Sequence, residues 1–501
     1  GRSRHGGQPH LPWLALDAGD AGEEHGEVWT AALAWSGPWR IAVTGLPDGR
    51  VQASGGAVDS GSPVALAPGE QYTSPVFAGL WTDGGFGAAS RAWHAHQLDH
   101  VVPGADLPRP VACYGTGADL PGESRGDALP PRELARRAAG MGVELFVVDD
   151  GPPGARLNDR TAPGGWDPER PADGLKTLSD EVRALGMRFG VRVAPETASP
   201  DGELFRARPE WFVRPADPAA GRGRMLLDLT RADVRDHLAR ALGALVHSAP
   251  VDHLVWELDQ PAGGPEAGGR TPGAGGRAHA EGLYELLDRL RAEHPGLTVE
   301  SCAAGARVDL GLLARTDRLD PSGNTDPLDR LHIQHGFSQL HPARVMASLV
   351  TGSPAPGPNH RRSPLRFRFV SAMAGALGIG ADLLEPGPEE RAEAASWIAL
   401  YKAVRPVVHH GALHRLRAPG DGGLTAVQYV HGADTVVLAW LPAQAFGTPV
   451  PPLRLRGLDR GARYRDVTTG VVQRGAVLAE RGLRTTLSGD LDAAVFHLRR
   501  V

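Results

Sequence analysis

The sequence predicts an α/β protein with a (β/α)8 TIM barrel, a truncated β-sandwich before it and a small β-domain after it. From about residue 108, short apolar segments alternate with segments that have helical spacing, which is typical of a parallel sheet. About eight such units follow one another, enough to close a barrel. The flanking regions are strand-like and interrupted by Gly, Pro and Asp turns.

The length of 501 residues exceeds what one hydrophobic core accommodates, so we expect several domains. The predicted boundaries are 1–104 for the N-terminal β-sandwich, 105–408 for the barrel and 409–501 for the C-terminal β-domain. Within 1–104 the expected strands include 27–35, 39–44 and 76–80. A Gly- and Pro-rich stretch at 261–276 follows the fourth barrel strand and is expected to be a surface insertion or a cover over the site.

The expected barrel strands are 111–114, 144–148, 188–193, 253–256 and 297–300, with less distinct ones near 316, 344–349 and 376–379. The expected helices are 131–140, 175–185, 232–246, 278–293 and about 389–403. The first of these starts with Pro and stops at Gly, as helices commonly do. His409 and His410 have no spacing for a metal and are expected on the surface or in a loop.

Composition excludes several classes of protein. A formal net charge of −5 argues against a nucleic-acid partner. Since no run of about 18 apolar residues occurs, we expect no membrane span. Cys113 and Cys302 are too few for a disulfide framework or a zinc site, and no motif indicates a nucleotide, flavin or metal, so we expect no cofactor. The start, GRSRHGGQPHLP, lacks the apolar core of a signal peptide and also lacks Met, which leaves the completeness of the N-terminus open. A cytoplasmic protein is the expectation.

The stretch 251–260, VDHLVWELDQ, carries the strongest functional signal. Apolar residues run up to Glu257, and a carboxylate at the C-terminal end of a barrel strand is where such enzymes hold catalytic groups. Burying a carboxylate without a partner is costly. Glu257 is therefore either a functional group or one half of a structural ion pair, with Arg192 as a candidate partner.

This decapeptide resembles the nucleophile strand of the glycoside hydrolase family 36 α-galactosidases, Lys-Trp-Asp-Met-Asn-Arg. Further segments follow in the order of the family: GGFGAASRAWH, ELFVVDDG, LGMRFG, ESC, NTDPLDRLHIQHGF and PLRFRFVSAMAGALGIGAD. The resemblance extends over nearly the whole chain from about residue 10, although the N-terminal sandwich of the family is longer. It implies a retaining hydrolase with one Asp nucleophile after strand four and one Asp acid/base after strand six, about 5 Å apart.

The family pattern changes at both catalytic positions. The nucleophile position is Glu257, one methylene longer than Asp, and a shift of roughly 1 Å can cost about 100-fold in rate. The acid/base position is Gly323, and loss of general acid catalysis costs roughly 100- to 10,000-fold. Asp320 stands where the family has Trp, on the same loop. We regard it as a candidate relocated acid, with an ordinary turn residue as the alternative. Asp326 is expected to cap the helix that begins near 327.

The resemblance also implies a set of substrate-binding candidates. Two matching aspartates, a matching Arg and Cys, and several residues at changed positions belong to it: Asp149, Asp150, Trp166, Arg192, Glu196, Arg222, Trp256, Asp259 and Cys302. Asp259 would favour the protonated form of Glu257 through like-charge repulsion. Trp166 and Trp256 would form an apolar wall or belong to the core. The changes gather at the barrel mouth, which indicates a remodelled pocket.

These observations lead to three hypotheses. The first is a repurposed family 36 barrel that uses carboxylate acid/base chemistry for dehydration, isomerisation or cyclisation of a polyol, glycoside or natural-product intermediate. The second is a retaining α-galactoside hydrolase with Glu257 as nucleophile and a displaced acid. The third is a sugar-binding protein without catalysis. Each implies a small-molecule ligand, and because the family is often oligomeric, a homo-oligomer stays open.

Overall fold

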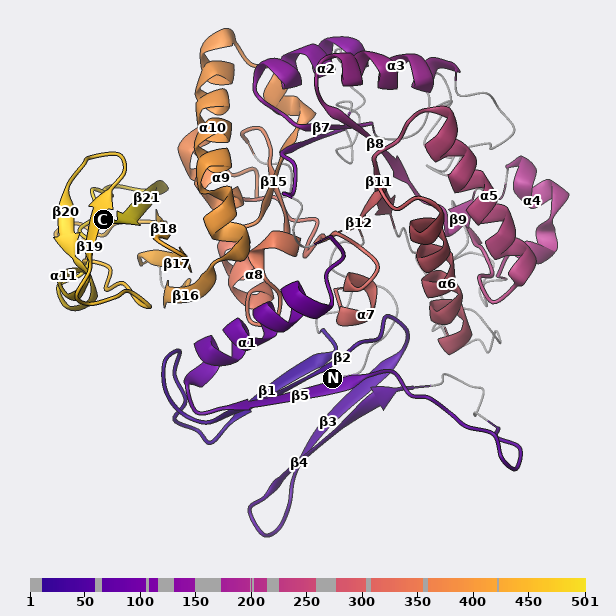
Figure 1. The fold of residues 1–501 in the computed structure, drawn as a ribbon, viewed down its shortest axis with the longest axis horizontal. Coiled ribbons are helices and arrows are strands. Elements are labelled where there is room, and N and C mark those ends of the chain that lie inside the picture. Colours follow the sequence, from indigo (N-terminus) through magenta and orange to yellow (C-terminus); the bar gives the residue numbers. More distant parts are fainter. Residues whose placement is uncertain are drawn as a thin grey trace.

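Eight parallel strands form a barrel at the centre of the molecule (Figure 1). The computed structural model describes residues 11–58, 65–104, 108–115, 130–148, 173–198, 200, 202–213, 225–257, 276–302, 308–354, 359–420 and 423–501. The barrel strands are β6 (Ala112–Tyr114), β7 (Leu145–Val148), β8 (Arg188–Val193), β11 (His253–Glu257), β12 (Thr298–Cys302), β13 (Arg318–Leu319), β14 (Ala347–Val350) and β15 (Ala376–Gly380).

The ring closes through parallel pairing. Consecutive barrel strands pair from β6 to β13 and from β14 to β15, and β15 pairs back to β6. A bridge between Leu319 and Met346 joins the remaining two sides. This arrangement, with a β-domain on each side, confirms the predicted fold class.

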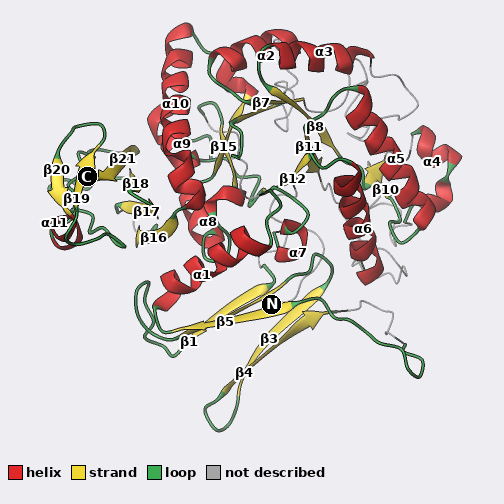
Figure 2. Cartoon of the chain, in the orientation of Figure 1, coloured by secondary structure: helices red, strands yellow, loops and turns green. Residues whose placement is uncertain are grey.

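Helices surround the barrel (Figure 2). They are α2 (Pro131–Gly140), α3 (Asp173–Ala184), α5 (Ala232–Ser248), α6 (Arg277–Glu293), α7 (Leu310–Leu313), α8 (Asp329–Phe337), α9 (Leu365–Ala372) and α10 (Pro388–His410). A short helix α4 (Glu203–Ala207) and a small pair of strands, β9 (Thr197–Ala198) and β10 (Met225–Leu226), lie beyond β8. No helix within the described ranges combines the length and low polarity needed to cross a bilayer.

Side chains alternate between the barrel interior and the helical layer. Val255 packs with Val147, Tyr114 and Cys302 in a small interior cluster, whereas its neighbour Leu254 belongs to the main core. Because side chains in a strand alternate with period two, Glu257 faces the same interior side as Val255. This alternation decides which of the candidate residues reach the barrel mouth.

Within its described residues, the N-terminal region contains two antiparallel sheets and one helix. The sheets are β1 (Trp13–Asp17), β2 (Val28–Leu33) and β5 (Phe77–Thr82), and the hairpin β3 (Trp39–Gly45) with β4 (Val51–Ala57). The helix α1 (Gly85–His100) lies between the three-stranded sheet and the barrel (Figure 1). The interpretation of residues 1–104 as strand-like throughout was therefore wrong for this segment.

Small residues let α1 pack closely. A Cβ atom added at Gly87 would lie 2.6 Å from the backbone oxygen of Glu23, and the Gly87 N–H donates to that same oxygen at 2.8 Å. The Trp93 indole donates to Thr30 of β2 at 2.8 Å. The glycines of this segment therefore allow α1 to pack closely against its neighbours. Treating Gly only as a turn residue does not predict this role.

The C-terminal region is a six-stranded antiparallel sheet with its own core. Its strands are β16 (Ala412–Arg417), β17 (Thr425–His431), β18 (Asp434–Leu441), β19 (Arg463–Asp466), β20 (Val472–Arg474) and β21 (Asp492–Arg500), and α11 (Gly475–Glu480) packs beside them. The expectation that His409 lies on the surface or in a loop was wrong. His409 is buried at the end of α10, and its Nε2 atom is 2.9 Å from the Tyr401 hydroxyl oxygen.

Candidate active site

The C-terminal ends of β8, β11, β12 and β13 bring four candidate residues to the barrel mouth. Glu257 is the last residue of β11 and pairs with Cys302, the last residue of β12. Arg192 lies on β8 and Asp320 directly follows β13. All four side chains are partly exposed, in contrast to the buried residues deeper in the same strands.

Cys302 links two of these residues. Arg192 Nη1 donates a hydrogen bond to Cys302 Sγ at 3.2 Å, and the thiol points toward Asp320 Oδ2 at 3.9 Å. Burial raises the pKa of the Cys302 thiol to about 12, although Arg192 acts in the opposite direction. The thiol therefore stays protonated at ordinary pH and is neither a nucleophile nor a metal ligand in this state.

Asp320 has the environment of a proton donor. Burial raises the pKa of its carboxyl, and the charge of Arg330 and a hydrogen bond from the Ser322 N–H at 3.1 Å do not overcome this effect. A carboxyl with a raised pKa retains its proton at a pH where an ordinary Asp has lost it. Asp320 thus combines a position at the mouth with a pKa shifted in the direction that general acid catalysis needs.

The loop after β13 contains no other candidate acid that points inward among the described residues. Gly323 is exposed and has no side chain to donate a proton. Asp326 is buried and occupied: its Oδ1 atom accepts from the Leu328 and Asp329 N–H groups, each at 3.0 Å, and its Oδ2 atom accepts from Arg361 Nε at 2.8 Å. The predicted capping role of Asp326 is confirmed, although α8 begins at Asp329.

Two other candidates point away from this group. Trp256 belongs to the main core and is 4% exposed, and its indole Nε1 donates to Glu196 Oε1 at 2.9 Å. Glu196 is fully buried, and its Oε2 atom lies 3.5 Å from His279 Nε2 of α6. The structure therefore places Trp256 and Glu196 between the barrel wall and α6, separate from Arg192, Cys302 and Asp320.

The remaining predicted substrate-binding residues lie outside the described residues. They are Asp149, Asp150, Trp166, Arg222 and Asp259. Among the residues that are described, no group of three or more His, Cys, Asp or Glu side chains is arranged to hold a metal ion.

A polar network that the sequence did not predict lies beneath the mouth. The Tyr114 hydroxyl donates to Glu300 Oε2 at 2.5 Å and accepts from Arg318 Nη1 at 2.9 Å. His253 Nε2 is 3.5 Å from the same Glu300 oxygen. Burial alone would raise the pKa of Glu300, but His253 and Arg318 outweigh it and lower the pKa. Glu300 is thus held as an anion with its charge balanced inside the barrel.

The Tyr114 ring packs in the barrel interior beneath the mouth. A Cβ atom added at Gly378 of β15 would lie 2.4 Å from the Tyr114 ring, so the ring needs a glycine opposite it. Gly378, in the middle of β15, is the sequence signal of a close approach by another side chain, and this contact was not predicted from the sequence.

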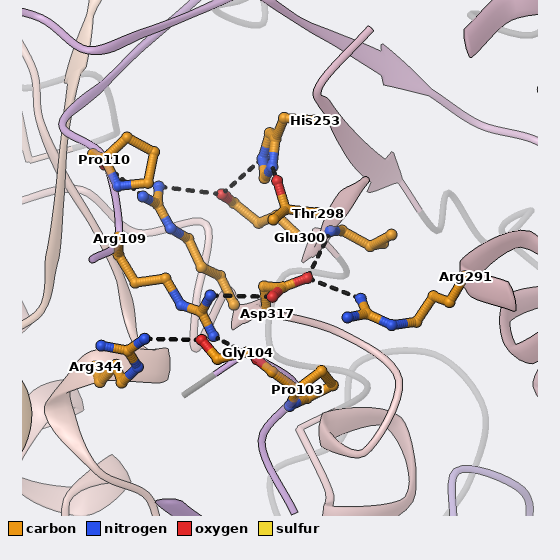
Figure 3. A network of polar contacts seen from close by, with 12 residues as sticks. Pro103, Gly104, Arg109, Pro110, His253, Arg291, Thr298, Glu300, Asp317 and Arg344 are labelled. Atoms are coloured by element: carbon orange, nitrogen blue, oxygen red, sulfur yellow. Dashed lines mark hydrogen bonds and ion pairs between the residues drawn. The ribbon is translucent and has the colours of Figure 1, made fainter. Parts of the chain in front are cut away.

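A second set of contacts surrounds Asp317 toward the opposite end of the barrel, and Figure 3 shows it beside Glu300 and His253 of the first network. Asp317, 2% exposed, accepts from Arg109 Nη1 at 3.0 Å, from Arg291 Nη1 at 2.9 Å and from the Val299 N–H at 2.9 Å. Asp317 precedes β13, whereas Asp320 follows it. The N-terminal face of such barrels typically contributes to stability, so we assign this network a structural role.

Comparisons with known proteins cover the whole length of the described fold. The Melibiase family model matches residues 71–411, the glycosyl hydrolase family 36 N-terminal domain matches 1–67, and the family 36 C-terminal domain matches 424–498. The α-galactosidase AgaA of Geobacillus stearothermophilus is 30% identical over 490 residues, covering 94% of this chain and 66% of that protein. An α-galactosidase of Escherichia coli is 31% identical over 474 residues, covering 93% and 65%.

Solved structures agree with these relatives. The galactosidase domain of an α-galactosidase–sucrose kinase, AgaSK, superposes with a TM-score of 0.89 at 25% identity, covering 98% of this chain and 68% of that chain. A variant of AgaA from Geobacillus stearothermophilus in complex with raffinose gives a TM-score of 0.87 at 28% identity, with 98% and 69% covered. The chain thus spans about two thirds of the length of these proteins.

Proposed function

Because the chain belongs to glycoside hydrolase family 36, we propose that it hydrolyses small α-galactosides with Glu257 as nucleophile and Asp320 as general acid. The observation that carries this proposal is the Asp320 carboxyl, which lies 3.9 Å from the thiol of Cys302, the strand partner of Glu257, and whose pKa is raised by burial. One carboxyl to attack and one to donate a proton is what this reaction requires.

The arrangement of the strands supports a separation between the carboxyls of Glu257 and Asp320 that is suitable for catalysis. Neighbouring strands lie about 4.8 Å apart, so β11 and β13, separated by β12, are roughly 10 Å apart at the backbone. Inward-facing side chains in a barrel converge on the axis, which brings the two carboxyls closer. Retaining enzymes need about 5–5.5 Å and inverting enzymes about 6.5–9.5 Å. The family resemblance implies retention, and the anomeric form of the first product distinguishes the two.

The proposed reaction has two steps. First, a Glu257 oxygen attacks the anomeric carbon, the glycosidic carbon–oxygen bond breaks, and the leaving oxygen takes the proton of Asp320. Second, water attacks the anomeric carbon, gives a proton to the Asp320 carboxylate, and the bond to Glu257 breaks. Asp320 returns to its protonated form and the enzyme is regenerated.

Small oligosaccharides are the substrates to test. AgaA variants have been crystallised with raffinose and with stachyose, both small oligosaccharides. The 25–31% identity of this chain to its α-galactosidase relatives supports the same substrate class here. A carboxylate at the mouth also suits the positive charge that develops on a sugar ring in the transition state.

The absence of a carboxyl at Gly323 favours a second candidate function. If Asp320 does not serve a sugar leaving group, the same two carboxyls suit proton transfer in a dehydration, isomerisation or cyclisation of a polyhydroxylated ligand. This reaction class would leave α-galactosides unhydrolysed. A protein that only binds sugars would bind raffinose without turnover.

The decisive experiment compares two leaving groups. We would measure kcat/KM for raffinose and for 4-nitrophenyl α-galactoside with the wild type, Glu257→Gln and Asp320→Asn. The matched control is Asp329→Asn, at the start of α8, whose carboxylate accepts from Asn324 at 2.9 Å on the outer side of the loop. Glu257→Gln should abolish both activities. Asp320→Asn should reduce raffinose turnover roughly 100- to 10,000-fold, and turnover of the activated aryl substrate much less, because a good leaving group needs little acid.

Two results would contradict the proposal. Full activity of Glu257→Gln on the aryl substrate would exclude Glu257 as the nucleophile. Equal losses on both substrates in Asp320→Asn would exclude Asp320 as the acid. The absence of turnover in the wild type would favour the second candidate function, and raffinose binding would then be measured by calorimetry.

A further inference from the structure

We propose that a cavity between the barrel and the C-terminal sheet is a binding site for water, and that one or two water molecules there join the two regions. The cavity has a volume of about 30 Å³. Residues of α8 and of the segments before β14 and β15 line it on one side, and residues of β16, β17 and β18 line it on the other. The proposal goes beyond the proposed function and does not depend on it.

The cavity lies toward the N-terminal face of the barrel, away from the mouth. Met346 directly precedes β14 and Ala374 comes two residues before β15, and both line the cavity. The C-terminal sheet lies against the helical layer of the barrel, with α9 packed on β18 (Figure 1). The Tyr429 hydroxyl of β17 donates to the Ala374 carbonyl oxygen at 3.3 Å. The cavity is therefore part of the joint between two regions of the protein, separate from Glu257 and Asp320.

Three buried polar side chains line this cavity, and each has one polar atom without a hydrogen-bond partner in the described part of the chain. The atoms are His341 Nε2, Thr425 Oγ1 and Trp440 Nε1. The three residues are 0%, 3% and 1% exposed. A buried donor or acceptor that stays unpaired costs free energy, and native proteins pair nearly all such groups with protein or with ordered water. The gathering of three such atoms at one cavity thus indicates a polar ligand.

Thr425 and Trp440 reach the cavity from the sheet. They are directly paired across β17 and β18, so their Cβ atoms lie about 4.5–5.5 Å apart on one face. That face meets the barrel, because Trp440 belongs to the main core, whereas its strand neighbour Leu441 belongs to the separate core of the C-terminal region. The hydroxyl and the indole N–H therefore approach the cavity from the same wall.

His341, which follows α8, presents a hydrogen-bond acceptor from the opposite wall. The Gln97 amide nitrogen donates to the carbonyl oxygens of Trp93 at 3.1 Å and Leu340 at 2.5 Å, which fixes the orientation of this amide. Gln97 Oε1 is therefore the acceptor for His341 Nδ1–H, at 2.7 Å. Burial lowers the pKa of His341 to about 3, so the ring is neutral at ordinary pH. A neutral imidazole has one N–H, and the Nε2 atom of His341 thus carries a lone pair.

The three atoms together specify an uncharged molecule that both donates and accepts hydrogen bonds. His341 Nε2 needs a donor, the Trp440 indole N–H needs an acceptor, and the Thr425 hydroxyl takes either role. The lone pair of His341 disfavours an anion, and the indole N–H disfavours a cation. Water meets all three demands, and a buried water typically makes about three hydrogen bonds. Because one water needs roughly 10–15 Å³ of such space, the cavity of about 30 Å³ holds one or two.

The first test compares two Thr→Val substitutions in the same sheet. Thr435 of β18 is 1% exposed and its hydroxyl also has no partner among the described residues, but Thr435 does not line the cavity. Thr435→Val should raise Tm, because it removes an unpaired buried hydroxyl. Thr425→Val should lower Tm, because it removes a hydrogen bond to the bound water. Equal increases of Tm in the two variants, followed by circular dichroism, would show that Thr425 binds no water and would overturn the proposal.

The second test needs no substitution. A crystal structure of the wild type, at a resolution that shows ordered water, should contain one or two water peaks within about 2.7–3.2 Å of His341 Nε2, Thr425 Oγ1 and Trp440 Nε1. In Thr425→Val, the peak held by His341 and Trp440 should remain and the contact at position 425 should be lost. A dry cavity in the wild type, or an ion bound to these atoms, would overturn the proposal whatever the stability of the variants.

Discussion

Substitutions of the two aspartates that flank β13 distinguish effects on stability from effects on catalysis. Asp317 lies at the N-terminal end, accepts hydrogen bonds from two arginines and one backbone N–H, and is 2% exposed. Asp320 lies at the mouth, where burial raises the pKa of its carboxyl. The same isosteric change, Asp to Asn, can be made at both positions three residues apart. We predict opposite consequences.

Asp317→Asn should destabilise the fold strongly. The change leaves the buried guanidinium of Arg109 and the partly buried one of Arg291 without their carboxylate, and breaking a buried ion pair costs about 3–5 kcal/mol. For domains of about 150–250 residues, 1 kcal/mol lowers Tm by about 2–4 °C, so a loss of roughly 6–20 °C is expected. The kcat/KM of the remaining folded enzyme should stay close to that of the wild type.

Asp320→Asn should leave stability intact or improve it. A folded-state pKa above the unfolded value of about 3.9 means that ionisation opposes folding as pH rises through this window. The Asn variant lacks this penalty at neutral pH, and the advantage should vanish below about pH 4. Thermal unfolding at pH 4 and pH 7, followed by circular dichroism, measures both variants. The reasoning fails if Asp320→Asn loses as much Tm as Asp317→Asn, or if Asp317→Asn abolishes catalysis without losing stability.

Three further predictions follow from the described contacts. In the Asp320→Asn variant, adding Gly323→Asp should restore a carboxyl at the acid position of the family and raise raffinose turnover by roughly 100-fold or more. An unchanged rate would show that this loop position no longer faces the substrate. Trp256→Phe should lower the free energy of unfolding by about 1–3 kcal/mol, because it removes the hydrogen-bond donor to buried Glu196, and it should leave KM unchanged. A raised KM at an unchanged free energy of unfolding would instead assign Trp256 to the substrate-binding site. Burial lowers the pKa values of His94 and His341 to about 3. As pH falls below about 6.5, the unfolded chain therefore binds more protons than the folded protein, and Tm should decline from there toward pH 4. An equally steep decline of Tm in His94→Gln would show that these histidines do not cause it.

Local sequence signals predicted the barrel well where they were strong. The helix 131–140 appears with the predicted bounds because a Pro start and a Gly stop are local features. The strand 188–193 also appears with its predicted bounds. The family resemblance is confirmed by the three family models. The weaker strands shifted: the one expected near 316 is Arg318–Leu319, and the one expected at 344–349 is Ala347–Val350.

The candidate site was predicted less completely, because its contacts are long-range. Glu257 was identified from its place at a strand end, and Asp320 from its place in the loop that resembles the acid/base loop of the family. The partners of Tyr114 were not, since Glu300 and Arg318 lie 186 and 204 residues away and meet it only after the ring closes. Arg192 was considered as an ion-pair partner of Glu257, and its contact with Cys302 could not be derived from spacing alone. Trp256 points out of the barrel because side chains alternate along β11, and only the structure shows which alternate set faces outward.

The most direct test of the central claim is covalent labelling of the nucleophile. An α-galactose-configured cyclitol epoxide esterifies the attacking carboxylate of a retaining galactosidase, and mass spectrometry of proteolytic peptides then locates the label. The account predicts one equivalent of label on Glu257, in the peptide that contains β11, and none in Glu257→Gln. A label on another carboxylate, or labelling that persists in Glu257→Gln, would contradict the assignment of Glu257 as the nucleophile.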